Sequence, residues 1–419
     1  MEREVGRDGA SPLVLDLMAR CPHLEREALN SGPAATLVDV AGVEAWAVSD
    51  PAVLGPLLTD SRVSKDPNRG WPAFRRGEIV GTWALEPWVG VHNMLCRDGA
   101  DHRRLRSVMS SAFTPRRIAA LVPRVEAIAA ELLDAMAELP TDRPVDLREH
   151  YAYPLPMRVI GELLGLPGQA ARPEFRAIVD GVFASHLTPE ESHANLRAFR
   201  ETLDGMLETK RAEPGDDLTS MLVAAHDSGE EGGSLDDREL TDTFSIVFGA
   251  GYETTVNLLD TAVTGLLDHP AQLARVRSGE VAWSEAAEEA LRFEAPIPYL
   301  PLRYALEDIE LADGTVIPAG GPILAAFGAA GRHPRAHGPT ADAFDITRPD
   351  KRHFSFGHGA HFCLGAPLAR AEAAAALPAL FERFPQLALA VPAEELEPVG
   401  SIVSNGHRAL PVWLAGPPR

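Results

Sequence analysis

One of the chain's three cysteines, Cys363, stands in a setting that suits a metal-bound thiolate. It follows a glycine-rich stretch, 354–362, and Pro367 shortly after it is typical of the first turn of a helix. Free backbone N–H groups at a helix N-terminus favour an anion, so a thiolate would be stabilised there. Glycines also allow the backbone to approach a flat ligand closely. The combination is compatible with a thiolate that binds the metal of a flat cofactor.

The residues of this stretch are also compatible with simpler roles. A single cysteine is most often a small buried hydrophobic side chain. A zinc site built from His358, His361 and Cys363 would need a fourth ligand, and the other two cysteines bring no second cluster of ligands. A dinucleotide-binding loop is disfavoured, because Phe362 stands where that motif needs its third glycine.

The spacing of the residues around Cys363 resembles the haem-binding signature of the cytochrome P450 superfamily. The matching pattern is Phe356-x-x-Gly359-x-x-x-Cys363-x-Gly365. The resemblance implies that Cys363 binds the iron of haem b (iron protoporphyrin IX), with Phe356 and Gly365 next to the cofactor. A thiolate ligand donates electron density to haem iron and favours cleavage of the O–O bond.

A second motif lies in the longest apolar segment of the chain, about 240–267. It reads Ala250-Gly251-Tyr252-Glu253-Thr254-Thr255 and resembles the oxygen-binding groove of the same superfamily. The resemblance implies that Ala250 and Gly251 let the helix pass close to the haem. It also implies that Glu253 and Thr254 form the acid–alcohol pair that supplies protons to oxygen. Taken alone, the segment is better explained by a packing glycine and a threonine bonded to its own helix, and the neighbouring motifs reverse this.

Glu289 and Arg292 are three residues apart, so they share one face of a predicted helix and can pair. The two residues lie in the sequence between the two motifs above, and they resemble the structural Glu-x-x-Arg pair of the superfamily. In the family a further arginine from a nearby loop completes this pair. The candidates are Arg332, Arg348 and Arg352.

Four basic residues match the places where the superfamily holds the two carboxylates of haem. His102 and Arg106 are four residues apart on one helix face, and Arg303 begins a strand. His361 stands two residues before Cys363. Buried carboxylates need such partners. A solvated surface charge is the alternative for each of the four.

Composition limits the remaining possibilities. The chain has 419 residues and a net charge of -21, which argues against nucleic acid and anionic membranes as partners. No stretch of about 18 uncharged apolar residues predicts a membrane span, and the first residues form no apolar leader. We therefore expect a cytoplasmic protein. Three widely spaced cysteines predict no disulfide framework.

The elements that must position these residues are mostly helical, with minor β-structure, in a single domain over residues 1–419. Alternating apolar residues predict strands at 36–40 and 44–48 and a hairpin at 308–317. The other expected elements are a helix that opens at Asp50-Pro51, helices over 118–139, 240–267 and 367–384, a break at 154–157 before a further helix to 166, an N-cap at Ser234 and irregular segments at 71–93 and 349–365. The resemblance implies the cytochrome P450 fold, with haem between the long helix and the Cys363 segment.

The resemblance further implies a monooxygenase that places one atom of O₂ in an apolar small molecule, such as a steroid, a macrolide or an aromatic compound. Actinobacterial family 154 is the most similar subgroup, through segments such as Phe113-Thr-Pro-Arg-Arg117 and Pro301-Leu-Arg-Tyr304. The expected pocket residues are Leu85, Trp88, Val91, Val182, Phe183, Phe248, Ala250, Tyr299, Leu300 and Ile402.

No nicotinamide or flavin motif is present, so we expect electrons from a ferredoxin and its reductase. Arg103 and Arg104 are expected to be solvated charges or part of a docking patch for such an acidic partner. A peroxide-driven enzyme and a non-catalytic haem protein are the alternatives. The presence of Glu253 and Thr254 disfavours both.

Overall fold

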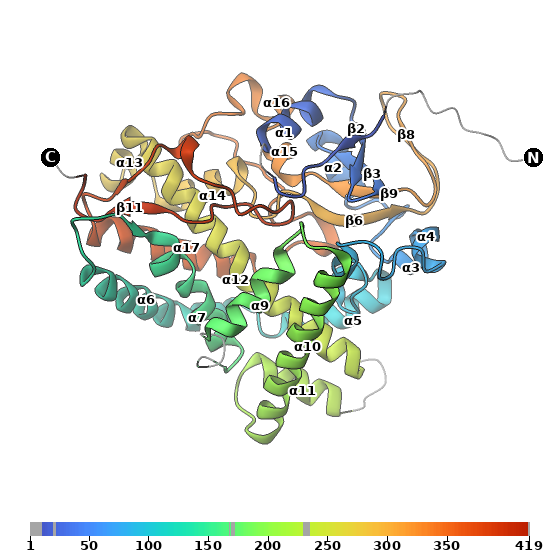
Figure 1. Ribbon diagram of the computed structural model, residues 1–419, viewed down its shortest axis with the longest axis horizontal. Coiled ribbons are helices and arrows are strands. Elements are labelled where there is room, and N and C mark those ends of the chain that lie inside the picture. Colours follow the sequence, from blue (N-terminus) through green and yellow to red (C-terminus); the bar gives the residue numbers. More distant parts are fainter. Residues whose placement is uncertain (1–10, 20–21, 167, 169–171, 229–234, 418–419) are drawn as a thin grey trace, which may run out of the picture.

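The computed structural model describes residues 11–19, 22–166, 168, 172–228 and 235–417. Helices form most of it. The largest group of strands lies to one side of them, beside the first helices of the chain, and a smaller group lies near the C-terminus (Figure 1). This confirms the prediction of a mostly α fold with minor β-structure. No helix in the described part of the chain is long and apolar enough to cross a membrane.

The helices vary from single turns to one of 32 residues. They are α1 (Pro22–Ser31), α2 (Pro51–Leu57), α3 (Pro67–Gly70), α4 (Pro72–Arg75), α5 (Gly99–Ser110), α6 (Pro115–Ala137), α7 (Pro154–Leu163), α9 (Pro173–Phe183), α10 (Pro189–Ala212), α11 (Leu218–Asp227), α12 (Asp237–Asp268), α13 (Pro270–Arg277), α14 (Trp283–Phe293), α15 (Phe327–Gly331), α16 (Pro334–His337) and α17 (Ala366–Arg383). Many begin at proline, whose fixed φ suits the first helical turn.

The longest helix, α12, runs through the middle of the molecule and packs against α7, α10, α14 and α17 (Figure 1). Its N-terminus is a capping box in which the side chains of Asp236 and Glu239 each accept the other's backbone N–H. The predicted N-cap, Ser234, lies outside the described residues. Most of α12 is buried, as its apolar sequence predicts.

A six-stranded sheet lies beside the helices, with the order β1-β2-β3-β9-β6-β4. Its strands are β1 (Leu13–Val14), β2 (Ala35–Val40), β3 (Val43–Val48), β4 (Val63–Ser64), β6 (Leu300–Ala305) and β9 (Pro322–Ala325). The smaller sheets are β10 (Ala388–Leu389), β11 (Pro411–Trp413) and β5 (Val145–Asp146), and the hairpin β7 (Ile309–Glu310) and β8 (Val316–Ile317). The two predicted N-terminal strands and the predicted hairpin are thus confirmed.

Two local predictions need correction. Pro154 does not break a helix but begins α7, which ends at Leu163 rather than at residue 166. The interruption before it is a π-helical turn, Arg148–Ala152. The second correction concerns Arg303, which is the fourth residue of β6 and not its first.

The predicted irregular segment at 71–93 contains α4 and a short 3-10 turn, Glu86–Trp88, and is held by aromatic packing. Trp71 stacks on Tyr304 with ring centroids 5.4 Å apart, and the indole of Trp83 donates to the carbonyl of Val40 at 2.8 Å. These contacts fix the loop against the sheet, next to the elements that carry the site.

Candidate active site

The segment around Cys363 is a loop that ends at the N-terminus of α17. Gly359 has a φ of 73°, and a Cβ there would lie 2.6 Å from Cγ2 of Thr59, so the turn requires glycine. The backbone N–H of Cys363 donates to the carbonyl of Phe356 at 2.8 Å and closes the loop. This turn places the sulfur of Cys363 directly before α17.

The Cys363 thiol has donors and cations close by. Burial raises the pKa of this thiol, while the backbone N–H groups of Gly365 and Ala366 and the charges of Arg106 and Arg370 lower it. The thiolate is the form that binds metals. The net shift of the pKa is upward, so the start of α17 and the two arginines offset only part of the effect of burial on the sulfur.

A cavity of about 230 Å³ lies between α12 and the Cys363 loop. The predicted site residues in its walls are His102, Arg106, Ala250, Gly251, Thr254, Arg303, Phe356, His361, Cys363 and Gly365. Of the residues predicted to bind the cofactor or to move protons, only Glu253 is missing from the walls. Residues more than 250 positions apart in the chain thus meet at one cavity.

Basic side chains from α5, β6 and the Cys363 loop meet at this cavity. The rings of His102 and His361 have centroids 4.2 Å apart, and Arg106 donates to the carbonyl of Phe362 at 2.8 Å. Nε2 of His102 and Nη1 of Arg303 are buried and have no hydrogen-bond partner among the described residues. Burial lowers the pKa of Arg303 to about 10 and that of His361 to about 4.

These unpartnered nitrogens show that the residues fit haem. A buried donor without an acceptor costs about 1–3 kcal/mol, so His102 and Arg303 favour an acceptor at the cavity. The propionates of haem would supply such acceptors, and Cys363 would supply the iron ligand. The carboxylate of Asp98 lies close to this group, with its Oδ1 3.8 Å from Nε2 of His361. Asp98 also accepts from the hydroxyl of Ser64.

The α12 motif places small residues and one hydroxyl on the cavity. The hydroxyl of Thr254 donates to the carbonyl of Ala250 at 2.8 Å, while the side chain lines the cavity. Gly251 also faces α7, because a Cβ there would lie 2.6 Å from Cδ1 of Ile160. The glycine therefore serves close packing between α12 and α7 as well as the cavity wall.

Glu253 points away from the cavity, into a buried polar cluster. Its Oε1 accepts from the hydroxyl of Ser404 at 2.6 Å, from Nδ2 of Asn257 at 3.3 Å and from Nη2 of Arg148 at 3.4 Å. Burial raises the pKa of Glu253, and Arg148 and Ser404 partly counteract this. A raised pKa suits a carboxyl that gives up a proton near neutral pH.

Known proteins are similar to this chain over nearly its whole length. The family model Cytochrome P450 matches residues 284–397. The 2-hydroxy-5-methyl-1-naphthoate 7-hydroxylase of Streptomyces carzinostaticus is 43% identical over 97% of this chain and 98% of its own. This chain belongs to the cytochrome P450 family.

Two further relatives refine the comparison. The 6-deoxyerythronolide B hydroxylase of Saccharopolyspora erythraea is 38% identical over 91% of this P450 and 93% of its own chain. The structure of CYP154A1 from Streptomyces coelicolor A3(2) has a TM-score of 0.92 and 53% identity, covering 96% of this chain and 100% of that one. The predicted resemblance to family 154 is confirmed. The protein is a P450 monooxygenase, and its family implies a haem cofactor.

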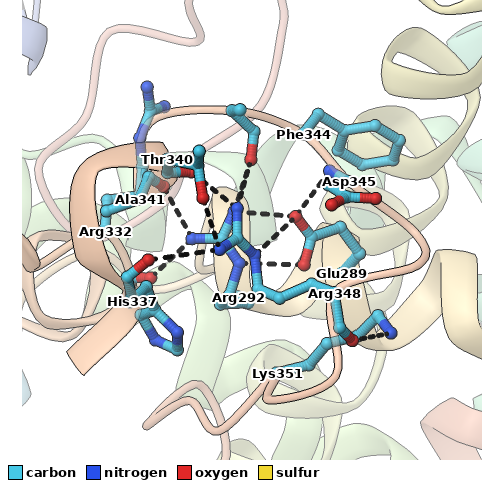
Figure 2. A network of polar contacts seen from close by, with 12 residues as sticks. Glu289, Arg292, Arg332, His337, Thr340, Ala341, Phe344, Asp345, Arg348 and Lys351 are labelled. Atoms are coloured by element: carbon cyan, nitrogen blue, oxygen red, sulfur yellow. Dashed lines mark hydrogen bonds and ion pairs between the residues drawn. The ribbon is translucent and has the colours of Figure 1, made fainter.

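The Glu-x-x-Arg pair of this P450 is fully buried and highly connected (Figure 2). Nε and Nη2 of Arg292 donate to the two oxygens of Glu289 at 2.8 and 2.7 Å. Arg348 is the added arginine, since its Nε lies 3.6 Å from Oε1 of Glu289. Arg332 instead pairs with Glu294 and Asp342, and Arg352 pairs with Asp350 at the surface.

Most of the predicted pocket residues serve the packed core. Only Ala250 and Leu300 line the cavity. Leu85, Tyr299 and Ile402 belong to the core beside the sheet, while Phe183 and Phe248 belong to the core around α12. Trp88 packs on Phe183, and Val182 packs against the same core. Other apolar residues line the cavity instead. They include Ile246 and Val247 on α12 and Pro296 and Ile297 in the segment after α14.

Two ionisable residues at or near the site are not predicted from the sequence. Glu372 lines the cavity from α17, and its Oε2 is buried with no hydrogen-bond partner in the described part of the chain. Burial raises the pKa of Glu372 well above its usual value. The sequence feature that indicates Glu372 is a single carboxyl on the apolar face of an alanine-rich helix. Lys65, buried directly after β4 and close to Arg303, carries no such signal.

Proposed function

We propose that this P450 inserts oxygen into an apolar small molecule, with haem b held between α12 and the Cys363 loop. One observation carries the proposal. Cys363, at the N-terminus of α17, and the unpartnered buried nitrogens of His102 and Arg303 line the same cavity. This combination provides an iron ligand and partners for two carboxylates at one place. We also propose that residues 1–419 form one domain and that the protein acts in the cytoplasm.

Bound haem would activate dioxygen, so that one oxygen atom enters the substrate and the other becomes water, with two electrons and two protons consumed. Thr254 presents its hydroxyl at the cavity wall and gives its own hydrogen to the carbonyl of Ala250, which leaves the oxygen lone pairs free to accept. Glu253, whose carboxyl lies on the other side of α12 against Arg148, is the proposed source of the proton that this hydroxyl would pass on. The apolar walls exclude bulk water from this transfer.

A largely apolar substrate suits the α12 side of the cavity. The side chains that α12 and the segment after α14 contribute are aliphatic, with the hydroxyls of Thr254 and Thr255 as their polar groups. The ionisable residues of the walls come from α5, β6, the Cys363 loop and α17. Relatives are named for a naphthoate and for 6-deoxyerythronolide B. We therefore propose an aromatic, macrolide or steroid compound, recognised mainly by shape.

Electrons are proposed to come from a ferredoxin and its reductase. Phe362, next to Cys363, is 41% exposed, and Arg352 and Arg370 lie on the same side of the Cys363 loop. An exposed aromatic ring among arginines suits an acidic electron carrier. Arg103 is exposed and could join this surface, whereas Arg104 is tied to Glu239 at 2.9 Å.

The absorption spectrum of the reduced protein under carbon monoxide tests the cofactor assignment. We expect the Soret band typical of thiolate-bound haem in the native protein and its loss in Cys363→His. A native spectrum typical of histidine-bound haem would contradict the proposal. Substrate-induced spin shifts, measured with steroids, macrolides and bicyclic aromatic acids, then identify the substrate class.

A peroxide-driven reaction is the second candidate. Product formation with hydrogen peroxide alone, at the rate seen with ferredoxin, reductase and O₂, would favour it. The hydroxyl of Thr254 at the cavity and the buried Glu253 behind it favour the O₂ reaction, because that reaction needs two protons delivered from the protein side.

A further inference from the structure

Glu253 belongs to a row of polar residues on the side of α12 that faces away from the cavity. Glu253, Asn257 and Asp260 recur at spacings of four and three, so they share one helix face. All three are buried. Nη1 of Arg148 reaches across this row, donating to Oδ1 of Asn257 at 2.9 Å and to Oδ2 of Asp260 at 3.0 Å.

The row ends at a histidine that reaches solvent. Nδ1 of His407 lies 2.6 Å from Oδ1 of Asp260, and the backbone N–H of His407 donates to Oδ2 at 2.9 Å. The imidazole of His407 is 23% exposed, whereas the carboxyl of Asp260 is 0% exposed. Protons from solvent therefore have access to His407 and not to the interior of the cluster.

The charges in this cluster depend on one another. Burial raises the pKa of Asp260, but His407 and Arg148 together hold it below its ordinary value, so Asp260 is ionised. Burial lowers the pKa of His407, but Asp260 outweighs this and the net shift is upward, with Glu294 adding to it. The negative charge of Asp180, on α9, raises the pKa of Glu253 further, as burial does. Arg148 is the cation that Glu253 and Asp260 share.

Charge balance couples the two ends of the cluster. When His407 is protonated, it compensates Asp260, and Arg148 is left to compensate an ionised Glu253. When His407 is neutral, the negative charge of Asp260 balances the positive charge of Arg148. The cluster is then uncharged only if Glu253 is protonated and neutral. A buried cluster with net charge is unfavourable. The two groups therefore compete for one proton.

We propose that His407 is a positioning residue for Glu253: protonation of His407 at the surface, acting through Asp260 and Arg148, sets whether Glu253 is ionised or holds a proton. The inference deepens the proposed function and rests on the role of Glu253 in proton supply. Through this coupling the protonation state of Glu253 responds to solvent pH on the side of α12 opposite the cavity, where a bound substrate does not interfere.

The coupling is measurable without turnover. Histidine ring carbons are labelled with carbon-13, and their pH titration is followed by nuclear magnetic resonance in the haem-loaded, reduced protein under carbon monoxide. Glu253→Gln removes a negative charge from the cluster, so the pKa of His407 should fall by about half a unit or more. An unchanged titration of His407 overturns the proposal. The His407 signal is assigned by its loss in His407→Gln.

His226 is a matched internal control. It also pairs with carboxylates, Asp227 at 2.6 Å and Asp237 at 2.8 Å, and its imidazole is 20% exposed. Its pKa is raised by these two partners, which lie outside the cluster around Glu253. The pKa of His226 should be the same in the native protein and in Glu253→Gln. An equal shift of both histidines would mean a general effect and would overturn the proposal.

A second measurement separates this inference from the proposed function. His407→Gln removes a positive charge, so the pKa of Glu253 should rise. The pH dependence of product formed per O₂ consumed should then move up by about half a unit, while His226→Gln should leave it in place. If Glu253→Gln leaves this ratio unchanged, the proton role of Glu253 fails. A shifted His407 titration in that case still supports the coupling itself.

Discussion

Replacement of Glu289 by glutamine removes a charge that two buried arginines share. The side chains of Glu289 and Arg292 are 0% exposed, and that of Arg348 is 7% exposed. All five N–H groups of Arg292 have acceptors: the two oxygens of Glu289 and the carbonyls of Gly331, Ala341 and Ala343. Oε1 of Glu289 also accepts from the backbone N–H of Asp345 at 2.7 Å.

Glu289→Gln keeps the shape but turns an acceptor-only group into one that carries its own N–H donors. One amide N–H group must then face the guanidinium donors, and both arginines lose their counter-charge. Breaking a buried ion pair in this way costs about 3–5 kcal/mol. We expect the thermal midpoint of the haem-loaded protein, followed by circular dichroism, to fall by roughly 3–6 °C.

The neighbouring residue supplies the control. Glu288 also pairs with two basic groups, Arg370 at 2.6 Å and His353 at 3.2 Å, but its side chain is 27% exposed. Glu288→Gln should therefore cost less than Glu289→Gln, because solvent screens this partly exposed pair. If Glu289→Gln lowers the midpoint no further than Glu288→Gln does, the network in Figure 2 does not stabilise the fold as argued.

Three further outcomes follow from the same structure. Thr254→Ala should lower the product formed per O₂ consumed by about tenfold or more, and Thr254→Ser should restore most of it; equal ratios in all three proteins would refute the hydroxyl's role. Arg303→Leu should speed transfer of haem to apomyoglobin by about tenfold or more, since a charge-assisted bond is lost, while Arg352→Leu at the surface should not. Hydrogen bonds from His353 and Arg370 outweigh burial and lower the pKa of Glu288 to about 2, so its stabilising contribution is present above about pH 4.5 and lost as the pH falls towards 2. Acid unfolding curves of the native protein and of Glu288→Gln should therefore converge near pH 2, and parallel curves would contradict this.

The elements that the sequence predicts well are those whose pattern is local. β2 and β3 alternate around a two-residue turn, and α12 is apolar over many turns, so nearest neighbours suffice to define them. The chemistry around Cys363 was equally accessible, because its glycines, cysteine and helix start lie within a dozen residues. The resemblance to the P450 family rests on such short patterns.

The features that could not be predicted depend on partners far along the chain. The path of the 71–93 loop depends on Trp71 meeting Tyr304, which no local pattern shows. The choice of Arg348 over Arg332 depends on where the loop after α16 returns to α14. Most of the predicted pocket residues turned out to be core, because apolar side chains that line a cavity and those that fill a core have the same composition.

The direction of Glu253 has a consequence for how α12 works. Thr254 faces the cavity and Glu253 faces Arg148, so adjacent residues present their polar groups on different sides of one helix. A proton from Glu253 reaches Thr254 only if the carboxyl turns away from Arg148 or a water molecule bridges the two groups. Turning is easier for a neutral carboxyl than for an ionised one, because an ionised one gives up its ion pair with Arg148. The state of His407 would therefore govern both whether Glu253 holds a proton and how freely it can deliver it.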